Sequence, residues 1–234
     1  MRLLIISLFL ILCSFTKAQS FEEITIATYH NFPPYIISKE KRIGLTYDLE
    51  KKLNKTKQAS NNRYTFKVRI YPRARINRLL DSGDRIIVPW VSTSWFKKHN
   101  LSNAYYSSKL ISDENVLISK SSQPINSLAN KKGLSYSSIR GSTFQGVSED
   151  FLLSNSRVNV SSYKQVFRMV LSVRVDFASM PRSVVDYYIS RYSSQFEIHI
   201  KSQKKFKYDR TILINKANKE LIKLINSSNK SLKL

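Results

Sequence analysis

Hydrophobic positions in the first half of the chain recur in two periods, one typical of strands and one of helices. Alternation of apolar and polar residues, or a short apolar run, predicts a strand, whereas apolar residues spaced by three or four predict an amphipathic helix. The expected strands are residues 24–29, 64–70 and 86–88, and the expected helices are residues 45–54 and 73–81. Gly83 is well placed to end the second helix.

The same rhythm starts again after about residue 110. Strands are expected at 116–118, 134–136, 175–178, 196–200 and 212–214, and helices at 144–153, 166–171, 181–189 and 221–225. Pro181 suits the first position of its helix. Strands that alternate with helices predict an α/β protein with mainly parallel sheets.

The first eighteen residues have the pattern of a secretory signal peptide. Arg2 is followed by the apolar run LLIISLFLILC, and small residues precede a cleavage point after Ala18. The alternative is a retained membrane anchor, but the run is shorter than the ~20 residues that span a bilayer. Cys13 is the single cysteine and lies inside this run, so the exported chain is expected to have no disulfide. Segment 1–18 therefore predicts export, most simply to a bacterial periplasm.

The chain is strongly basic, with 39 Lys+Arg against 16 Asp+Glu and a formal net charge of +23. Such a balance raises the possibility of nucleic acid or an anionic surface as a partner. The basic residues are spread along the whole chain, however, whereas nucleic-acid-binding proteins concentrate them on one face. We therefore expect no nucleic acid partner, and a secreted protein that binds polyanions stays as an alternative.

Candidate catalytic and metal-binding residues are few. The three histidines, His30, His99 and His199, have no second ligand at metal-binding spacing. The sequence contains no GxSxG, P-loop or GxGxxG motif. Carboxylates such as Asp48 and Glu50 fit the first turn of a helix, where the helix dipole favours negative charge. We expect neither a cofactor, nor a metal ion, nor catalysis.

Aromatic residues follow two of the expected strands, at ends where ligands bind in open α/β sheets. Tyr29, Phe32 and Tyr35 lie in the loop YHNFPPY after the first strand. The segment WVSTSW after the third strand adds the two tryptophans and three hydroxyls, followed by lysines. The alternative for both segments is that the rings turn into the core.

A third candidate segment, Arg140-Gly141-Ser142-Thr143, precedes an expected helix. The free N–H groups at a helix start, together with the hydroxyls, could hold an anion. Taken alone, this segment is more typical of an ordinary helix cap by Ser142 or Thr143.

The order of these segments resembles the family 3 extracellular solute-binding proteins. The stretch ITIATYHNFPPYIISKEKRIGLTYDLEKKLN is similar to the start of that family, with Pro33-Pro34-Tyr35, Gly44 and Asp48-Leu49 at matching places. The similarity continues through YPRARINRLLDSGDRIIV, INSLANKKGLSYSSIRGSTFQGV, SVRVDFASMPRSVVDYYI and ANKELIKLINSSNKSL. It implies a type II periplasmic-binding-protein fold with a two-strand hinge. Lobe 1 would comprise residues 20–108 and 205–234, and lobe 2 residues 109–204.

The resemblance also implies a ligand site, from which this chain departs at two charged positions. Amino-acid-binding members carry an arginine where this chain has Trp95 or Lys98, and an aspartate where it has Pro181. Each lost charged bond to a buried ligand group would cost roughly 1.5–3 kcal/mol. A standard α-amino acid is therefore not the expected ligand, and a neutral or anionic solute with a flat apolar part fits better.

The resemblance implies a monomer that binds a small molecule and works with an ABC permease or a sensor kinase. A sensory or enzyme-associated module of the same fold is a further alternative. The candidate ligand-binding residues are Tyr29, Phe32, Tyr35, Trp90, Ser92, Thr93, Trp95, Lys98, Arg140, Ser142, Thr143, Met180 and Arg182.

Overall fold

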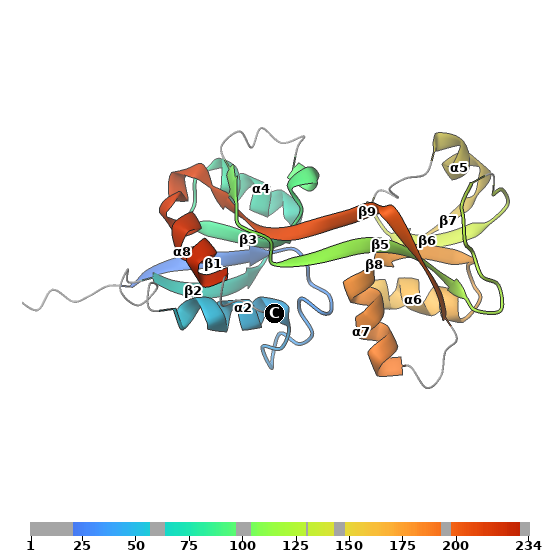
Figure 1. Ribbon diagram of the computed structural model, residues 1–234, viewed down its shortest axis with the longest axis horizontal. Helices are drawn as coiled ribbons and strands as arrows, with labels where there is room; N and C mark the ends of the chain where they lie inside the picture. The colour runs from blue at the N-terminus through green and yellow to red at the C-terminus, as the bar shows by residue number, and fades with distance from the viewer. Residues whose placement is uncertain are drawn as a thin grey trace, which may run out of the picture.

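Two groups of strands and helices form an elongated molecule, which Figure 1 shows as two lobes joined by long strands. The computed structural model describes residues 21–56, 64–96, 104–129, 131–142, 148–192 and 198–229. Segment 1–18, Lys98 and Thr143 lie outside the described residues. Within the described part of the chain, no helix has the length and apolar character needed to cross a membrane.

The first lobe is built on three parallel strands in the order β2–β1–β3. The strands are β1 (Glu22–Thr28), β2 (Tyr64–Ile70) and β3 (Ile86–Val91), with a short β4 (Ala104–Tyr106) farther along the chain. The helices are α2 (Leu45–Asn54), α4 (Arg73–Asp81) and α8 (Glu220–Asn229). Leucines and isoleucines of α2 and α8 pack on one face of this sheet, and those of α4 on the other.

The second lobe repeats this plan with the parallel strands β8–β6–β7, to which β5 is added antiparallel. The strands are β5 (Ile111–Lys120), β6 (Ser135–Ile139), β7 (Ser156–Val160) and β8 (Phe177–Pro181). The helices are α5 (Glu149–Ser154), α6 (Tyr163–Leu171) and α7 (Arg182–Tyr192). Helices α6 and α7 cover one face of the sheet, and Phe151 of α5 packs with Tyr136 and Phe177 on the other.

One strand, β9 (Ile198–Asn215), runs for 18 residues through both lobes. It pairs antiparallel with β3 and β4 in the first lobe and with β5 over the rest of its length. The prediction of two separate strands at 196–200 and 212–214 is therefore wrong, because residues 198–200 and 212–214 belong to the one strand β9. Residues 196 and 197 lie outside the described residues. Described residues in its middle, such as Lys201 and Lys207, are exposed, so this stretch lacks the apolar alternation that marks a half-buried strand.

The expected α/β fold with two lobes and a two-strand hinge is confirmed. Helices 45–54 and 73–81 have the expected bounds. Pro181 ends strand β8 instead of lying inside the helix, which begins at Arg182. Strands β4 and β7 were not expected; β7 alternates serine, arginine and asparagine with two valines and lies at the sheet edge.

Candidate functional site

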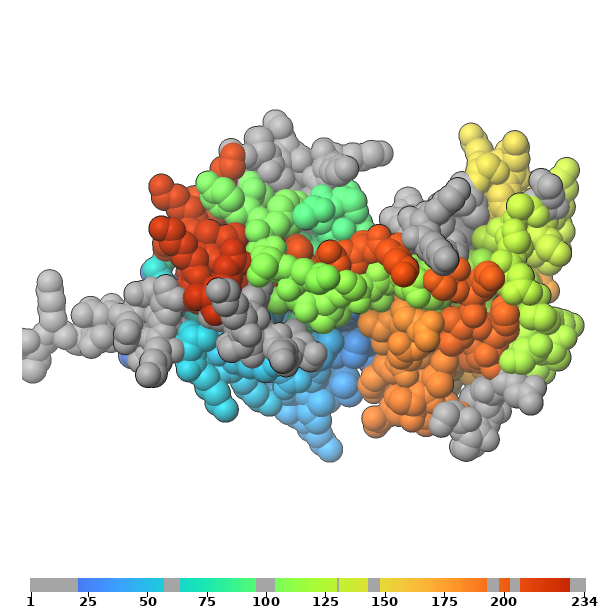
Figure 2. Space-filling model, viewed as in Figure 1, coloured from blue at the N-terminus to red at the C-terminus, as the bar shows by residue number. Residues whose placement is uncertain are grey.

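Segments of both lobes and of the hinge meet at the waist of the molecule. The two hinge strands, β5 and β9, contribute side chains here. Further side chains come from the segment between β1 and α2, the residues after β3 and the first residues of α6 and α7. In Figure 2 the blue segment after β1 and the orange helix α7 face each other across this waist. The carboxyl ends of parallel strands are where open α/β sheets bind ligands.

A cluster of rings from the first lobe lines this region, and we call it the ring cluster. It comprises Tyr29, His30, Phe32, Tyr35 and Trp95. His30 lies at its centre, with ring centroids 4.2 Å from Tyr29, 5.6 Å from Phe32, 5.3 Å from Tyr35 and 6.1 Å from Trp95. Ring pairs at such distances attract one another beyond the burial of their area.

Phe32 connects the ring cluster to the second lobe. Its ring packs edge-on to Tyr163, the first residue of α6, at 4.7 Å between centroids. Phe32 also packs against the main cores of both lobes. This contact between the lobes is lost if the lobes move apart.

Backbone hydrogen bonds hold the segment that carries the ring cluster. The N–H groups of Leu45 and Thr46, at the start of α2, donate to the carbonyls of Pro34 and Tyr35 at 3.0 Å each. Gly44 makes this approach possible, since it has a φ of 131° and a Cβ there would lie 2.6 Å from the Tyr35 carbonyl oxygen. The segment is therefore fixed against the helix that follows it.

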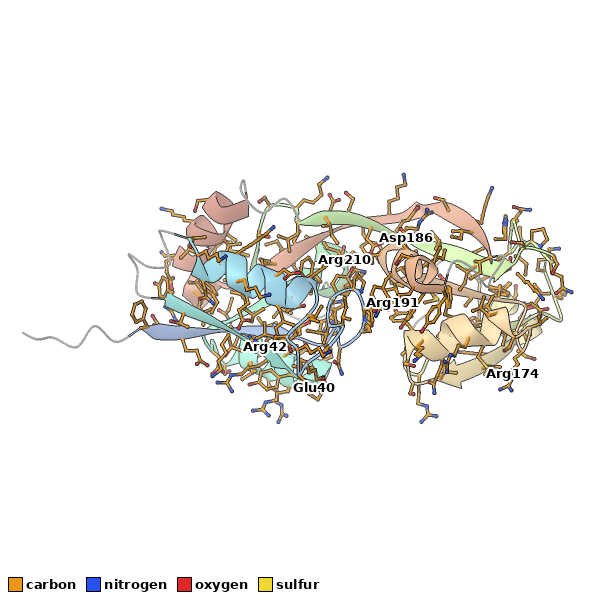
Figure 3. All side chains as sticks on the ribbon, turned by 90° about the horizontal axis from the view of Figure 1, so that it is seen from below. Glu40, Arg42, Arg174, Asp186, Arg191 and Arg210 are labelled. Carbon is orange, nitrogen blue, oxygen red and sulfur yellow. The ribbon has the colours of Figure 1, made fainter. Side chains whose placement is uncertain are left out.

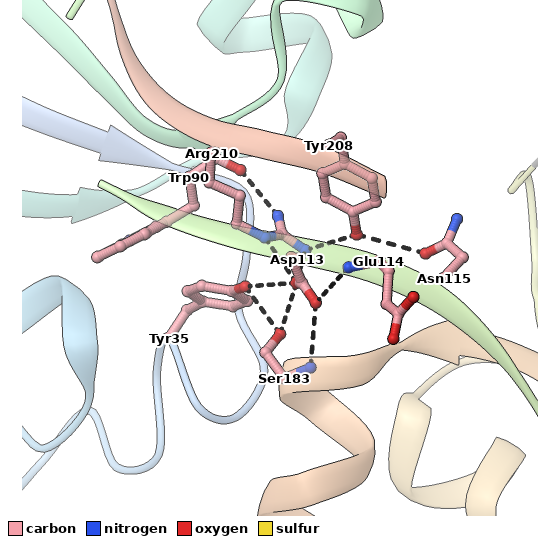
Figure 4. A network of polar contacts seen from close by, with 8 residues as sticks. All are labelled: Tyr35, Trp90, Asp113, Glu114, Asn115, Ser183, Tyr208 and Arg210. Carbon is pink, nitrogen blue, oxygen red and sulfur yellow. Dashed lines mark hydrogen bonds and ion pairs between the residues drawn. The ribbon is translucent and has the colours of Figure 1, made fainter. Parts of the chain in front are cut away.

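Behind the rings lies a buried ion pair between the two hinge strands, Arg210 of β9 and Asp113 of β5 (Figure 4). Each side chain is 1% exposed, and two guanidinium nitrogens of Arg210 lie 2.8 Å from Asp113 Oδ2. Asp113 also accepts hydrogen bonds from the backbone N–H of Glu114 (2.9 Å) and from Ser183 N (3.2 Å) and Oγ (2.7 Å). The Tyr35 hydroxyl, 3.0 Å from Ser183 Oγ, connects the first lobe to this network.

The guanidinium group of Arg210 is enclosed by aromatic rings. Its Cζ lies 4.9 Å from the ring centroid of Tyr35, 5.2 Å from that of Trp95 and 5.0 Å from that of Tyr208. It also donates to the carbonyl of Trp90 at 2.8 Å and to the Tyr208 hydroxyl at 3.1 Å. Figure 3 shows Arg210 between the lobes, whereas Arg174 and Arg191 lie on the second lobe.

Trp90 supports this arrangement from within the core of the first lobe. Its side chain is fully buried and its indole N–H donates to Thr46 Oγ1 at 2.9 Å. Its φ of 66° is rare for a bulky residue, and the pairing of β3 with β9 shifts register between Val88 and Val91. Backbone strain of this kind costs free energy and persists where the surroundings enforce it.

Burial keeps the phenols of the site protonated at neutral pH. It raises the pKa of Tyr163 to about 12 and that of Tyr35 and Tyr208 further, against the opposing effect of Arg210. Burial lowers the pKa of Arg210, but Tyr35, Tyr208 and Asp113 outweigh it and raise that pKa overall. The site thus presents neutral hydroxyls and a mutually neutralised ion pair.

His30 is neutral as well. Burial lowers its pKa well below 6.5, and the positive charges of Arg210 and Arg73 lower it further. Its side chain is 3% exposed, and the described residues provide no hydrogen-bond partner for Nδ1. A solute that enters the ring cluster would find an unsatisfied polar atom there.

Of the expected ligand-binding residues, Tyr29, Phe32, Tyr35 and Trp95 lie together in the ring cluster. Trp90 lies beneath it. Ser92 is buried with its Oγ 3.1 Å from Ser94 Oγ, and Thr93 is exposed in the short 3-10 helix Thr93–Phe96.

The expected residues of the second lobe have local roles in the structure. Met180 is fully buried in the core. Arg182 pairs with Asp186 one turn along α7, with 2.8 Å between Nε and Oδ1. Ser142 Oγ donates to the carbonyl of Ile139, and Arg140 is exposed after β6.

Six residues of the site were not expected from the sequence: His30, Asp113, Tyr163, Ser183, Tyr208 and Arg210. Four of them lie at the starts of helices or in the hinge strand β9, where the sequence indicates caps or exposed charge. The stretch YDRT before the apolar run ILI was the available signal, because an arginine that enters a buried strand needs a buried partner.

Comparison with solved structures places this geometry on a known fold. An ancestral arginine-binding protein bound to arginine matches with a TM-score of 0.65 and 19% identity, covering 90% of this chain and 92% of that one. An amino acid ABC transporter substrate-binding protein from Streptococcus pneumoniae, bound to L-arginine, matches with a TM-score of 0.67, 16% identity and 90% and 89% coverage.

A third similar structure is an ancestral amino acid-binding protein described as a precursor of cyclohexadienyl dehydratase. Its TM-score is 0.67 at 18% identity, covering 90% of this chain and 89% of that one. No protein-family model and no curated protein sequence matches the chain. The chain therefore has the two-lobe, type II fold of the periplasmic binding proteins, the fold of amino-acid-binding proteins of ABC transporters.

Proposed function

We propose that this chain is an exported solute-binding protein that captures a small molecule between its lobes. The carrying observation is that one site draws its side chains from both lobes and from both hinge strands. Tyr35 of the first lobe and Ser183 of the second share the same hydrogen-bond network. Its partner would be an ABC permease or a sensor kinase. Two similar structures are described as substrate-binding proteins of amino acid ABC transporters.

Capture follows from the contacts that a bound solute makes with each lobe. A solute that touches both Phe32 and Tyr163 binds the closed arrangement, in which these two rings are in contact, better than an open one. It therefore shifts the equilibrium toward closure and stabilises the folded chain by mass action. The lobe boundaries that we propose are 20–108 with 205–234, and 109–204.

The chemistry of the site favours an uncharged or anionic solute with a flat ring. Phe32, Trp95 and Tyr163 offer ring faces and edges, and His30 offers a polar atom without a partner. The excess of positive charge on the chain attracts anions before closure. Soluble small molecules of this kind are the first to screen.

The test is a thermal-shift and scattering screen of aromatic carboxylates, small sugars and amino acids, followed by calorimetry. We expect one ring-bearing solute to raise the melting temperature and to compact the protein. Phe32→Ala should weaken its affinity by about tenfold or more, which corresponds to the ~1.4 kcal/mol of a lost ring contact. Phe21→Ala is the matched control, because Phe21 is an exposed phenylalanine at the edge of the first lobe.

Two outcomes contradict this proposal. Steady conversion of the bound compound to a product indicates an enzyme of the same fold. Micromolar binding of an ordinary α-amino acid that Phe32→Ala leaves unchanged places the binding site elsewhere. Export is tested separately: the mature protein is expected to begin at Gln19, by intact mass of a periplasmic extract.

A further inference from the structure

Arg210 occupies the site as a bound cation would. Rings of Tyr35, Trp95 and Tyr208 surround its guanidinium at about equal distances, 4.9, 5.2 and 5.0 Å from Cζ. The carboxylate of Asp113 lies 2.8 Å away. Rings that enclose a cation, with a carboxylate beside them, are a recurring way in which proteins bind positively charged ligands.

The carboxylate of Asp113 has no acceptor position left for a ligand. Oδ1 accepts from the backbone N–H groups of Glu114 and Ser183 at 2.9 and 3.2 Å. Oδ2 accepts from Arg210 Nε at 2.8 Å, from Ser183 Oγ at 2.7 Å and from the Tyr35 hydroxyl at 3.4 Å. A carboxylate provides about four lone-pair sites, so a cationic solute binds Asp113 only by displacing one of these donors. Arg210 is the donor among them that carries a positive charge.

Neighbouring acidic residues on the hinge strands have other partners. Glu114 accepts from Ser202 Oγ at 2.6 Å, and Asp209 accepts from Ser112 Oγ at 2.7 Å. Both hydrogen bonds are exposed to solvent, unlike the buried pair. In the described part of the chain, Asp113 is thus the carboxylate that pairs with the ring-enclosed guanidinium of Arg210.

We infer that Asp113 and the rings of Tyr35, Trp95 and Tyr208 form a guanidinium-binding box between the lobes, that Arg210 is its tethered occupant, and that this occupancy excludes cationic and zwitterionic solutes from the site. The inference rests on the proposed function in one respect, since exclusion has meaning only for a site that binds solutes. The box itself is a property of the fold and is tested independently.

The side chain of Arg210 is therefore replaceable by a free molecule of the same chemistry. Truncation by Arg210→Ala leaves three ring faces around an empty volume and a buried carboxylate without its cation. A free alkylguanidinium fits that volume and restores the charge pair. An alkylammonium of the same charge fits less well, because it lacks the planar fork of N–H donors.

The experiment compares the full chain with its Arg210→Ala variant by calorimetry, using ethylguanidinium and ethylammonium as probes. We expect the variant to bind ethylguanidinium at least about tenfold more tightly than the wild type does, and more tightly than it binds ethylammonium. The double variant Asp113→Asn with Arg210→Ala should lose this gain, since the amide carries no charge. Equal binding of ethylguanidinium by wild type and variant overturns the inference, as does a folded variant that binds neither probe.

Arg210→Ala leaves an unpaired buried charge, which is strongly destabilising. If the variant does not fold, a second measurement tests the inference. In that case circular dichroism is recorded with each probe at about 10 mM, where binding stabilises the folded state by mass action. The expected result is recovery of the folded spectrum with ethylguanidinium and not with ethylammonium. Recovery with neither probe overturns the inference.

The outcomes separate this inference from the proposed function. If the wild type binds L-arginine between its lobes, the proposed function stands, and the inference that Arg210 excludes cationic solutes is contradicted. If the wild type binds no solute but Arg210→Ala binds ethylguanidinium, the box stands and the proposed function is contradicted.

Discussion

His30 illustrates how burial determines the role of a single residue. Its ring lies among four others and its side chain is 3% exposed. Histidine titrates near 6.5 in water, yet here the neighbouring guanidinium groups and the loss of solvent both oppose its protonation. It therefore acts as a neutral ring with one unsatisfied nitrogen.

The depressed pKa of His30 predicts a loss of stability in acid. Below about pH 6.5 the unfolded chain binds a proton at this residue that the folded chain does not, so the free energy of unfolding falls as pH decreases. The contribution of His30 is fully present above pH 6.5, and its slope approaches about 1.4 kcal/mol per pH unit below that value. The measurement is urea unfolding from pH 7.5 to pH 5.

His30→Gln should remove this part of the slope, because glutamine does not titrate. His30→Asn is the second variant, because asparagine does not titrate either and should give the same reduced slope. An identical slope in the wild type and in His30→Gln contradicts the prediction.

At the scale of one element, Gly44 joins the ring-bearing segment to helix α2. Its φ of 131° and ψ of 162° belong to a region that is essentially restricted to glycine. We expect Gly44→Ala to lower the free energy of unfolding by about 3 kcal/mol or more, since strain of about 1–3 kcal/mol adds to a backbone clash. Chemical denaturation measures this loss.

Gly133→Ala provides the comparison, because Gly133 also has a positive φ (71°) but a Cβ there meets no atom within 4 Å. Its expected cost is about 1–2 kcal/mol. Equal costs at the two positions would show that the approach of Gly44 to the Tyr35 carbonyl is not what requires glycine.

Most helices and strands could be predicted from the sequence, because their residues pack on one face. The helix 45–54 is an example, with Leu49 and Leu53 fully buried. The stretch of β9 around Lys201 and Lys207 could not, because these described residues are exposed where the strand crosses between the lobes and has no core to cover. The same holds for edge strand β7, whose polar residues are exposed.

The candidate site could be predicted only in its local part. Tyr29, Phe32 and Tyr35 are neighbours in one segment that follows a strand, and the sequence shows them together. Asp113 and Arg210 are 97 residues apart, and nothing in either local pattern indicates that the other is its partner. Ser183, two residues after Pro181, is 70 residues from its partner Asp113, so this contact cannot be predicted from the local pattern either.

At the scale of the whole molecule, the excess of positive charge opposes compaction. The chain has 39 Lys+Arg against 16 Asp+Glu, so repulsion among cations outweighs the exposed ion pairs, which contribute about 0–1 kcal/mol each. Raising the NaCl concentration from about 0.01 M to about 0.1 M shortens the screening length from about 30 Å to about 10 Å. We expect the melting temperature to rise by about 2–4 °C, equivalent to about 1 kcal/mol for a chain of this size.

Differential scanning calorimetry at several salt concentrations measures this rise. Sodium perchlorate at matched ionic strength is the control, because simple screening gives the same shift for both salts. A melting temperature that falls with salt would show that the ion pairs, and not the repulsion, dominate.

The long strand β9 also sets the order in which the protein can be completed during synthesis. It lies between β3 and β5 in the sheet, yet it is the last strand in the described part of the chain. A growing chain that has not yet reached Ile198 lacks one strand from each lobe, whatever else it has formed. Neither lobe can finish folding while most of the polypeptide emerges. The second lobe waits for the first part of β9, and the first lobe waits for the last part of β9 and for α8. A polypeptide built in this order therefore stays incompletely folded until β9 and α8 have both been made.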